Sequence, residues 1–187
     1  MRIIKEIRKN RRNRKGEREG YWEEYYDNGL LKYKGMYNKG NRYEYWEYYH
    51  LNGQLLYKGL YENNQMEGYW EFYHSNGEID NKGLFSNGIR CDGYWNFYYD
   101  NGKIDSMGSY KNGKQEGYWE QYYSDGNLMF KGSYVNGYKD GYWEYYDRDG
   151  NLTSKGMFKT GLKDGLWEWY DEKGRIELSR KYNAGEY

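Results

Sequence analysis

The chain has 187 residues, and its 29 basic and 29 acidic side chains give a formal net charge of zero, so the whole molecule is not a polyelectrolyte. Its single cysteine excludes an internal disulfide and a cysteine-based zinc site, and no apolar run is long enough for a transmembrane helix. Aromatic residues make up 22% of the sequence and proline is absent, which favours strands and turns over helices. The first residues lack the apolar core of a signal peptide, so we expect a cytoplasmic protein.

The N-terminal segment, residues 1–18, is strongly basic. One interpretation is that it is a degenerate half-repeat that caps the array of repeats formed by the rest of the chain, because charges on an edge strand discourage further pairing. The other is that it is an arm that binds anionic lipid or nucleic acid. The candidate anion-binding residues are Arg8, Lys9, Arg11, Arg12, Arg14 and Lys15.

Residues 19–187 repeat a unit of about 24 residues, a period typical of arrays in which neighbouring units stack to bury their apolar residues. One tryptophan marks each of the seven units. These are Trp22, Trp46, Trp70, Trp95, Trp119, Trp143 and Trp167.

Each unit predicts two strands and two turns. The first strand contains the tryptophan, and the second contains Leu or Ile, usually followed by Lys-Gly and then Tyr or Phe. Between them, most units have Asn-Gly or Asp-Gly, which predicts a two-residue type I′ turn with φ > 0 at both residues. The sequence therefore predicts an all-β fold, an elongated single-layer antiparallel β-meander of seven hairpin repeats.

This turn also predicts the register of each hairpin. It pairs the Glu after the tryptophan with the Lys before the glycine, as in Glu23 and Lys34, and opposite charges in that position stabilise a strand pair. It places each tryptophan opposite a glycine, as in Trp22 and Gly35, so we expect each indole ring to lie on the glycine of its own hairpin. Alternation then puts the tryptophans and the Tyr or Phe of the second strand on one face, and the Glu–Lys pairs together with a further row of tyrosines on the other.

The variable positions on the aromatic face are the candidates for contact with a partner, because Tyr and Trp are enriched among interface hot spots. We expect Tyr48, Phe72 and Phe97 to form an apolar anchor patch. The full candidate set is Tyr48, Phe72, Phe97, Tyr145 and Trp169.

The sequence shows no convergent catalytic set, and we expect neither enzymatic activity nor a cofactor. The two histidines, His50 and His74, occupy equivalent positions of consecutive units, which places them too far apart to share a zinc ion. Cys91 has no paired base and is interpreted as incidental.

The repeated pattern Gly-Tyr-Trp-Glu-x-Tyr-Tyr-x-x-Asn-Gly-x-Leu-x-x-Lys-Gly-x-Tyr-x-Asn-Gly resembles the bacterial and viral variant of the MORN repeat, found in the YwqK-type antitoxin family. The resemblance covers about residues 19–187. Local departures include Glu44, which stands where other units have glycine, and the loss of Lys-Gly from the last unit. The resemblance implies an interaction module.

Three functional hypotheses follow. The first is a non-enzymatic protein-binding module, which by resemblance is antitoxin-like or neutralises an effector. The second is a scaffold that associates with phospholipid or nucleic acid through the basic arm. The third is a structural rod or a homodimer.

Overall fold

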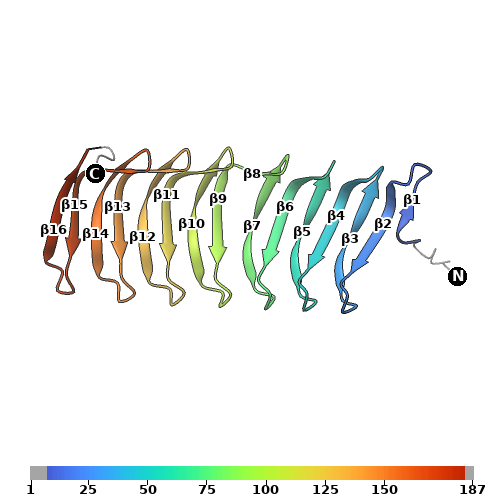
Figure 1. Ribbon diagram of the computed structural model, residues 1–187, viewed down its shortest axis with the longest axis horizontal. Helices are drawn as coiled ribbons and strands as arrows, with labels where there is room; N and C mark the ends of the chain where they lie inside the picture. Colours follow the sequence, from blue (N-terminus) through green and yellow to red (C-terminus); the bar gives the residue numbers. More distant parts are fainter. Residues whose placement is uncertain (1–7, 184–187) are drawn as a thin grey trace. The chain divides into compact units, whose positions relative to one another are not determined.

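In the computed structural model, residues 8–183 are described, and they form β-strands joined by short turns, with no helix among them (Figure 1). The chain divides into two compact units, residues 1–90 and 91–187. Within each unit, consecutive strands pair antiparallel to form one open sheet. The predicted all-β meander of hairpin repeats is confirmed.

The first unit contains three repeat hairpins, preceded and followed by a two-residue strand. Each strand pairs with the next one along the chain. The strands are β1 (Arg11–Arg12), β2 (Arg18–Tyr25), β3 (Leu31–Asn38), β4 (Asn41–Tyr49), β5 (Leu55–Glu62), β6 (Gln65–Tyr73), β7 (Ile79–Ser86) and β8 (Ile89–Arg90).

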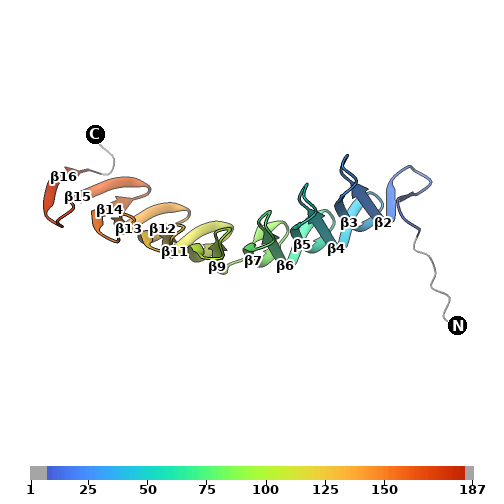
Figure 2. The same cartoon turned by 90° about the horizontal axis from the view of Figure 1, so that it is seen from below.

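The second unit contains four repeat hairpins, again with consecutive strands paired. Seen from below, the hairpins of each unit follow one another, and no second sheet covers them within residues 8–183 (Figure 2). The strands are β9 (Gly93–Tyr98), β10 (Ile104–Lys111), β11 (Lys114–Tyr122), β12 (Leu128–Val135), β13 (Tyr138–Tyr146), β14 (Leu152–Lys159), β15 (Leu162–Tyr170) and β16 (Ile176–Tyr182).

The turn inside each hairpin differs from the prediction, although the predicted register is correct. Between β2 and β3, Tyr26 donates its N–H to the Leu30 carbonyl, and only Gly29 has positive φ. This is a three-residue loop of the kind that ends in a left-handed glycine, so the predicted type I′ turn is wrong here. A bulge at the Glu24–Tyr25 step restores the register and pairs Glu23 with Lys34.

The type I′ turns lie instead between hairpins. At the turn from β7 to β8, Asn87 and Gly88 have φ values of 50° and 77°. The equivalent turn from β3 to β4 uses Lys39 and Gly40, with φ values of 48° and 80°. A turn of this type matches the twist of the strands that it joins.

The tryptophans form the core, but five of them stack on the glycine of the preceding hairpin rather than on that of their own: Trp46, Trp70, Trp119, Trp143 and Trp167. A Cβ atom built on Gly35 would overlap the ring of Trp46, and one on Gly59 would overlap the ring of Trp70. The predicted stacking within one hairpin is therefore wrong, although Trp22 and Gly35 are register partners.

A bulge between hairpins explains this shift. Between β3 and β4 the register changes after Lys34, so that residues 44–46 of β4 face Gly35 alone. The Trp46 ring then lies back over Gly35, and its indole N–H donates to the Met36 carbonyl at 3.2 Å. The same bond recurs from Trp70 to Leu60 at 3.1 Å. Each repeat thus buries its tryptophan against its neighbour, as stacked repeats require.

Candidate interaction surfaces

The face that carries the Glu–Lys pairs, here called the charged face, is crossed by ion pairs that join one hairpin to the next. Lys58 lies opposite Glu47 within its hairpin, but its ion pair, at 2.7 Å, is with Glu71 of the following hairpin. Lys131 likewise bonds Glu144 at 2.9 Å. The predicted register partners are correct, whereas the expected ion pairing within each hairpin is wrong.

Each of these carboxylates also accepts a hydrogen bond from the hydroxyl of the tyrosine two residues further along its strand. Tyr73 donates to Glu71 at 2.8 Å, and the Lys58 ammonium lies 5.5 Å from the centre of the Tyr73 ring. The hydrogen bond from Lys58 is the main cause that lowers the pKa of Glu71. At the N-terminal end, hydrogen bonds from Lys9 and Tyr25 lower the pKa of Glu23 to about 2.

The charged face of the first unit also carries exposed apolar side chains between these ion pairs. Tyr45 is paired with Leu60, and Tyr69 with Leu84. Their exposed fractions are 47% and 45% in the first pair and 48% and 55% in the second. We call Tyr45, Leu60, Tyr69 and Leu84 the tyrosine strip.

A shallow hollow of about 360 Å³ lies within the tyrosine strip, between Tyr45 and Tyr69. Leu60 lines it, together with the Lys58–Glu71 ion pair. Within the described residues, neither strip tyrosine has a hydrogen-bond partner for its hydroxyl, whereas Tyr118 of the second unit donates to Glu120. The hollow therefore presents apolar walls, two available hydroxyls and an ion pair.

In the second unit, Tyr142 and Met157 form one such exposed pair, but the corresponding surface of its first two repeats is more polar. Tyr94 and Tyr118 are exposed there too, but serines take the places of Leu60 and Leu84. The two serines are Ser109, opposite Tyr94, and Ser133, opposite Tyr118.

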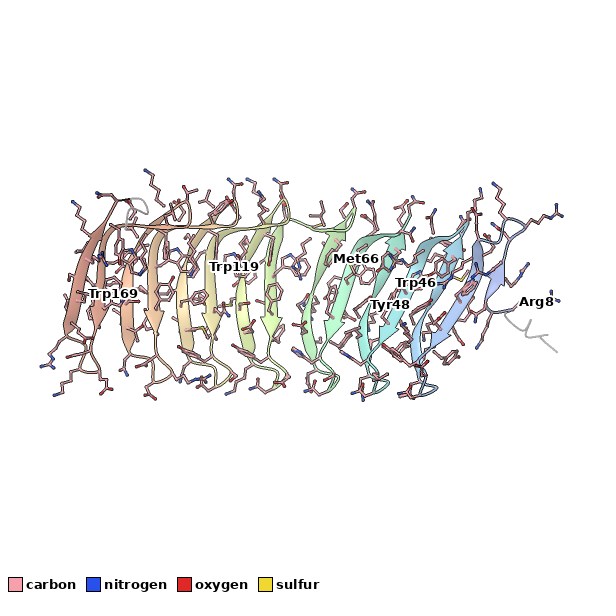
Figure 3. All side chains as sticks on the ribbon, in the orientation of Figure 1. Arg8, Trp46, Tyr48, Met66, Trp119 and Trp169 are labelled. Carbon is pink, nitrogen blue, oxygen red and sulfur yellow. The ribbon has the colours of Figure 1, made fainter. Side chains whose placement is uncertain are left out.

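The opposite face, here called the tryptophan face, contains the contact residues predicted from the sequence. In the first unit, Tyr48 on β4 and Phe72 on β6 are both half-buried and lie on either side of Tyr57 (Figure 3). The Tyr48 ring stacks on Tyr57 with centroids 4.4 Å apart, and its hydroxyl accepts a bond from Arg42 at 3.0 Å. These two predicted residues therefore belong to one aromatic row.

In the second unit, the predicted contact residues are also half-buried beside the tryptophans. Phe97 stacks on Trp119 at 6.3 Å, Tyr145 packs against Phe130 at 5.8 Å, and Trp169 packs against Trp167 at 5.9 Å. Each fills the sheet face as well as presenting an edge to solvent.

The basic N-terminal residues include both bonded and exposed side chains. β1 pairs with β2, and the Arg11 carbonyl accepts the Trp22 indole N–H at 3.1 Å, as the preceding hairpin does in later repeats. Lys9 bonds Glu23 at 2.6 Å, and Arg12 donates to the Gly16 carbonyl. The other four candidate side chains are exposed and make no ion pair within residues 8–183. These are Arg8, Arg11, Arg14 and Lys15.

The histidines and the cysteine show no arrangement for chemistry. His50 contacts the Tyr73 carbonyl at 3.0 Å and so links neighbouring turns. In the preceding hairpin, Tyr26 occupies the equivalent position and donates its hydroxyl to the Tyr49 carbonyl. His74 lies 4.0 Å from Asp80, and Cys91 is a free thiol. Residues 8–183 contain no cluster of three or more potential metal ligands.

The tyrosine strip is the surface that the sequence analysis missed. The predicted register already placed the residue before each tryptophan on the charged face, opposite the residue after each glycine. The residue after the glycine changes from Leu60 and Leu84 to Ser109 and Ser133. That change in the sequence could have identified the tyrosine strip.

Comparison with known proteins identifies the repeat. A family described as "MORN repeat variant" matches residues 18–39, 45–63, 66–87, 92–112, 115–136 and 139–160. The hairpin β15–β16 lies outside these matches, and it carries Arg180 where the other repeats have the glycine under an indole ring. None of the curated proteins matches the chain. Among the described residues, no helix is long and apolar enough to cross a membrane.

Proposed function

Because the chain belongs to the MORN repeat variant family, whose repeats are non-catalytic modules for protein or membrane interactions, we propose that it is a cytoplasmic protein-binding module. The observation that carries this proposal is the tyrosine strip on the charged face of the first unit. Tyrosine offers a large rigid contact area and a hydroxyl in one side chain, which is why it is frequent in interface hot spots.

The strip has the features of an interface centre. Its four side chains lie on the adjacent strands β4 to β7, where the ion pairs hold the underlying sheet in a fixed arrangement. The ion pair beside the hollow satisfies its own charges, so a partner can cover it without leaving a single buried charge. A partner that presents an apolar side chain with a neighbouring polar group fits this surface.

Affinity capture with a matched pair of variants tests the proposal. We expect the intact chain to retain a protein partner from native lysate in stoichiometric amount, and the double variant Tyr45→Ala, Tyr69→Ala to lose it. The control, Tyr94→Ala with Tyr118→Ala, removes two exposed tyrosines that face serines, and it should retain the partner. Equal capture by the two double variants would contradict the proposal.

A finer version of this function is that of an antitoxin-like protein that neutralises a toxin or effector. It is supported by the resemblance of the repeat and by the non-catalytic character of the family. The captured partner decides this point, because a neutralised protein should lose its own activity in the complex and regain it when the strip variant replaces the intact chain.

The tryptophan face is a second proposed contact surface for a partner, through Tyr48 and Phe72 in the first unit and Phe97, Tyr145 and Trp169 in the second. Its support is that these rings are only half-buried. The variant Phe72→Ala tests it in the same capture assay, and loss of the partner with an intact tyrosine strip would move the contact to this face.

Association with anionic lipid or nucleic acid is favoured by one observation, the four exposed cations around β1. Binding through them should weaken as salt rises and disappear when Arg8, Arg11, Arg14 and Lys15 are changed to Gln. Binding that ignores salt would exclude this role. The segment is also proposed to cap the array, because β1 occupies the edge of β2.

Self-association is the remaining candidate, and it is favoured by β16, whose residues are exposed apart from Tyr182. Within the described residues β16 pairs only with β15, which leaves the backbone groups of its other edge available to a second strand. Sedimentation that shows a monomer at high protein concentration would reject it.

A further inference from the structure

On the tryptophan face, one position carries a cation that lies among aromatic rings in four of the seven repeats. This position comes four residues before the tryptophan. Arg42 lies 4.1 Å from the Tyr61 ring centre, and Lys163 lies 4.2 Å from that of Trp167. These repeats thus supply their own cations to the rings, an arrangement stabilised by the negative potential of the ring faces.

Lys139 shows the arrangement most fully. Its ammonium group lies 4.9, 4.4, 5.1 and 5.4 Å from the ring centres of Phe130, Trp143, Tyr145 and Phe158. It also donates to the Tyr145 hydroxyl at 2.8 Å. Four aromatic rings therefore form a cage around one alkylammonium group, and burial lowers the pKa of that group.

The repeat around Met66 has the same cage but a different side chain at the cation position (Figure 3). Tyr57, Trp70, Phe72 and Phe85 occupy the places of the four rings around Lys139. The centroid distances Tyr57–Trp70, Tyr57–Phe72, Trp70–Phe72 and Trp70–Phe85 are 6.0, 5.8, 6.3 and 6.4 Å. The matching distances in the Lys139 cage are 5.7, 5.8, 6.3 and 6.0 Å.

A third repeat lacks both the cation and two of the rings. Gln115 occupies the cation position there, and Ser106 and Gln121 stand in two of the four ring positions. The Met66 cage differs from that repeat, because it retains all four rings although its own residue is neutral. Arg90 lies 6.0 Å from the Phe85 centre, at the outer limit of such an interaction.

We propose that the Met66 cage binds an alkylammonium group supplied from outside the chain. Tyr57, Phe72 and Met66 are half-buried, so their edges are open to solvent. Methionine is unbranched and flexible, and its side chain can move aside for a ligand more readily than a branched one. Rings with the spacing of the Lys139 cage then surround the cation, and Trp70 and Phe85 form the buried side of the site.

An alkylated ammonium fits this site better than a bare one, because a bare ammonium is strongly hydrated and the cage offers no carboxylate to replace its water. A methylated lysine side chain and a choline group share this chemistry. The site lies on the face opposite the tyrosine strip, so it can succeed or fail independently of the proposed protein contact.

Nuclear magnetic resonance of methionine methyl groups in the full chain tests the site. Tetramethylammonium should shift the Met66 methyl signal in a saturable way, with weak affinity, and leave the other methionines unchanged. Choline should do the same, while its neutral isostere 3,3-dimethylbutanol should bind at least about fivefold more weakly, since it lacks the cation–π attraction. A trimethyllysine peptide and phosphocholine then distinguish the two sources of the group.

Two variants taken from this chain's own repeats serve as controls. Met66→Lys supplies an internal cation, as Lys139 does, and Tyr57→Ser with Phe72→Gln copies the ring positions of the Gln115 repeat. Both variants should abolish tetramethylammonium binding. For these variants, binding is measured from the methyl signal of the ligand instead of that of Met66. Should the double variant fail to fold, Met66→Lys decides alone. The proposal is overturned if the wild-type signal does not saturate, if the neutral isostere binds equally well, or if Met66→Lys binds as tightly as wild type.

Discussion

A glycine beneath the indole ring joins successive repeats within each unit. Trp70 is fully buried, and Gly59 of the preceding hairpin leaves the space that its ring fills. No other residue type provides that space, because even a methyl group on Gly59 would overlap three ring atoms. The glycine that weakens its own strand therefore stabilises the contact between repeats.

We predict that Gly59→Ala lowers the free energy of unfolding by about 1–3 kcal/mol, as expected for overpacking a buried site. Denaturant unfolding followed by tryptophan fluorescence measures this loss. The loss should shrink when Trp70 is also changed to Leu and persist when Trp46 is changed instead. Coupling of Gly59 to Trp46 rather than to Trp70 would contradict the stacking described above.

Glu44 is a second residue whose backbone is informative. It has φ of 59°, whereas the equivalent positions of other repeats are glycines, such as Gly68 with φ of 70°. Although Glu44 departs from the repeat pattern, the backbone keeps the left-handed conformation there. A residue with a side chain costs about 1–2 kcal/mol in this conformation. Glycine avoids that cost, but it loses more backbone entropy on folding, which offsets part of the gain.

We therefore predict that Glu44→Gly raises the free energy of unfolding by about 0.5–1 kcal/mol. The reverse change, Gly68→Glu, should lower it by a similar amount. Thermal unfolding of the two variants checks both signs, and a destabilised Glu44→Gly protein would show that its side chain makes a favourable contact.

At the scale of the strand, the ion pairs make the stability of the array depend on pH. Glu71 has a lowered pKa in the folded state, first because Lys58 donates to it. The folded state thus binds fewer protons than the unfolded state, and the stabilisation is complete above the unperturbed glutamate pKa of 4.5 that applies to the unfolded chain. It is lost as the pH falls through the lowered folded-state pKa.

Changing Lys58 to Met should lower the free energy of unfolding by about 0.5–1 kcal/mol at neutral pH, and by less at a pH low enough to protonate Glu71 in the folded state. Urea unfolding at the two pH values measures the difference. The matched change Lys82→Met removes the register partner of Glu71 within its own hairpin, and its effect should be smaller. A larger effect of Lys82→Met would show that the ion pair forms within the hairpin in solution.

The strand register could be predicted from the sequence, whereas the packing between repeats could not. Paired positions such as Glu23 and Lys34 determine which residues face each other, and a compensating bulge preserves that register even though the turn differs. The position of the Trp46 ring depends on a second bulge at Glu44, in the strand that follows Gly35. The glycine two residues before most tryptophans was its signal in the sequence.

For the whole molecule, a regular repeat provides many equivalent surfaces, and function depends on the positions where the repeats differ. The Tyr45–Leu60 and Tyr69–Leu84 pairs of the first unit differ from the Tyr94–Ser109 and Tyr118–Ser133 pairs of the second. The seven tryptophans, which the sequence displays most clearly, are largely occupied with the core. Recognition is therefore assigned to exposed residues that vary between repeats.

Hydroxyl-radical footprinting of the chain with its captured partner tests this assignment most directly, because it reads the exposure of individual side chains. We predict that Tyr45, Leu60 and Tyr69 become protected in the complex while Tyr118 keeps its reactivity. Unchanged reactivity of Tyr45 and Tyr69, or equal protection of Tyr118, would contradict the account.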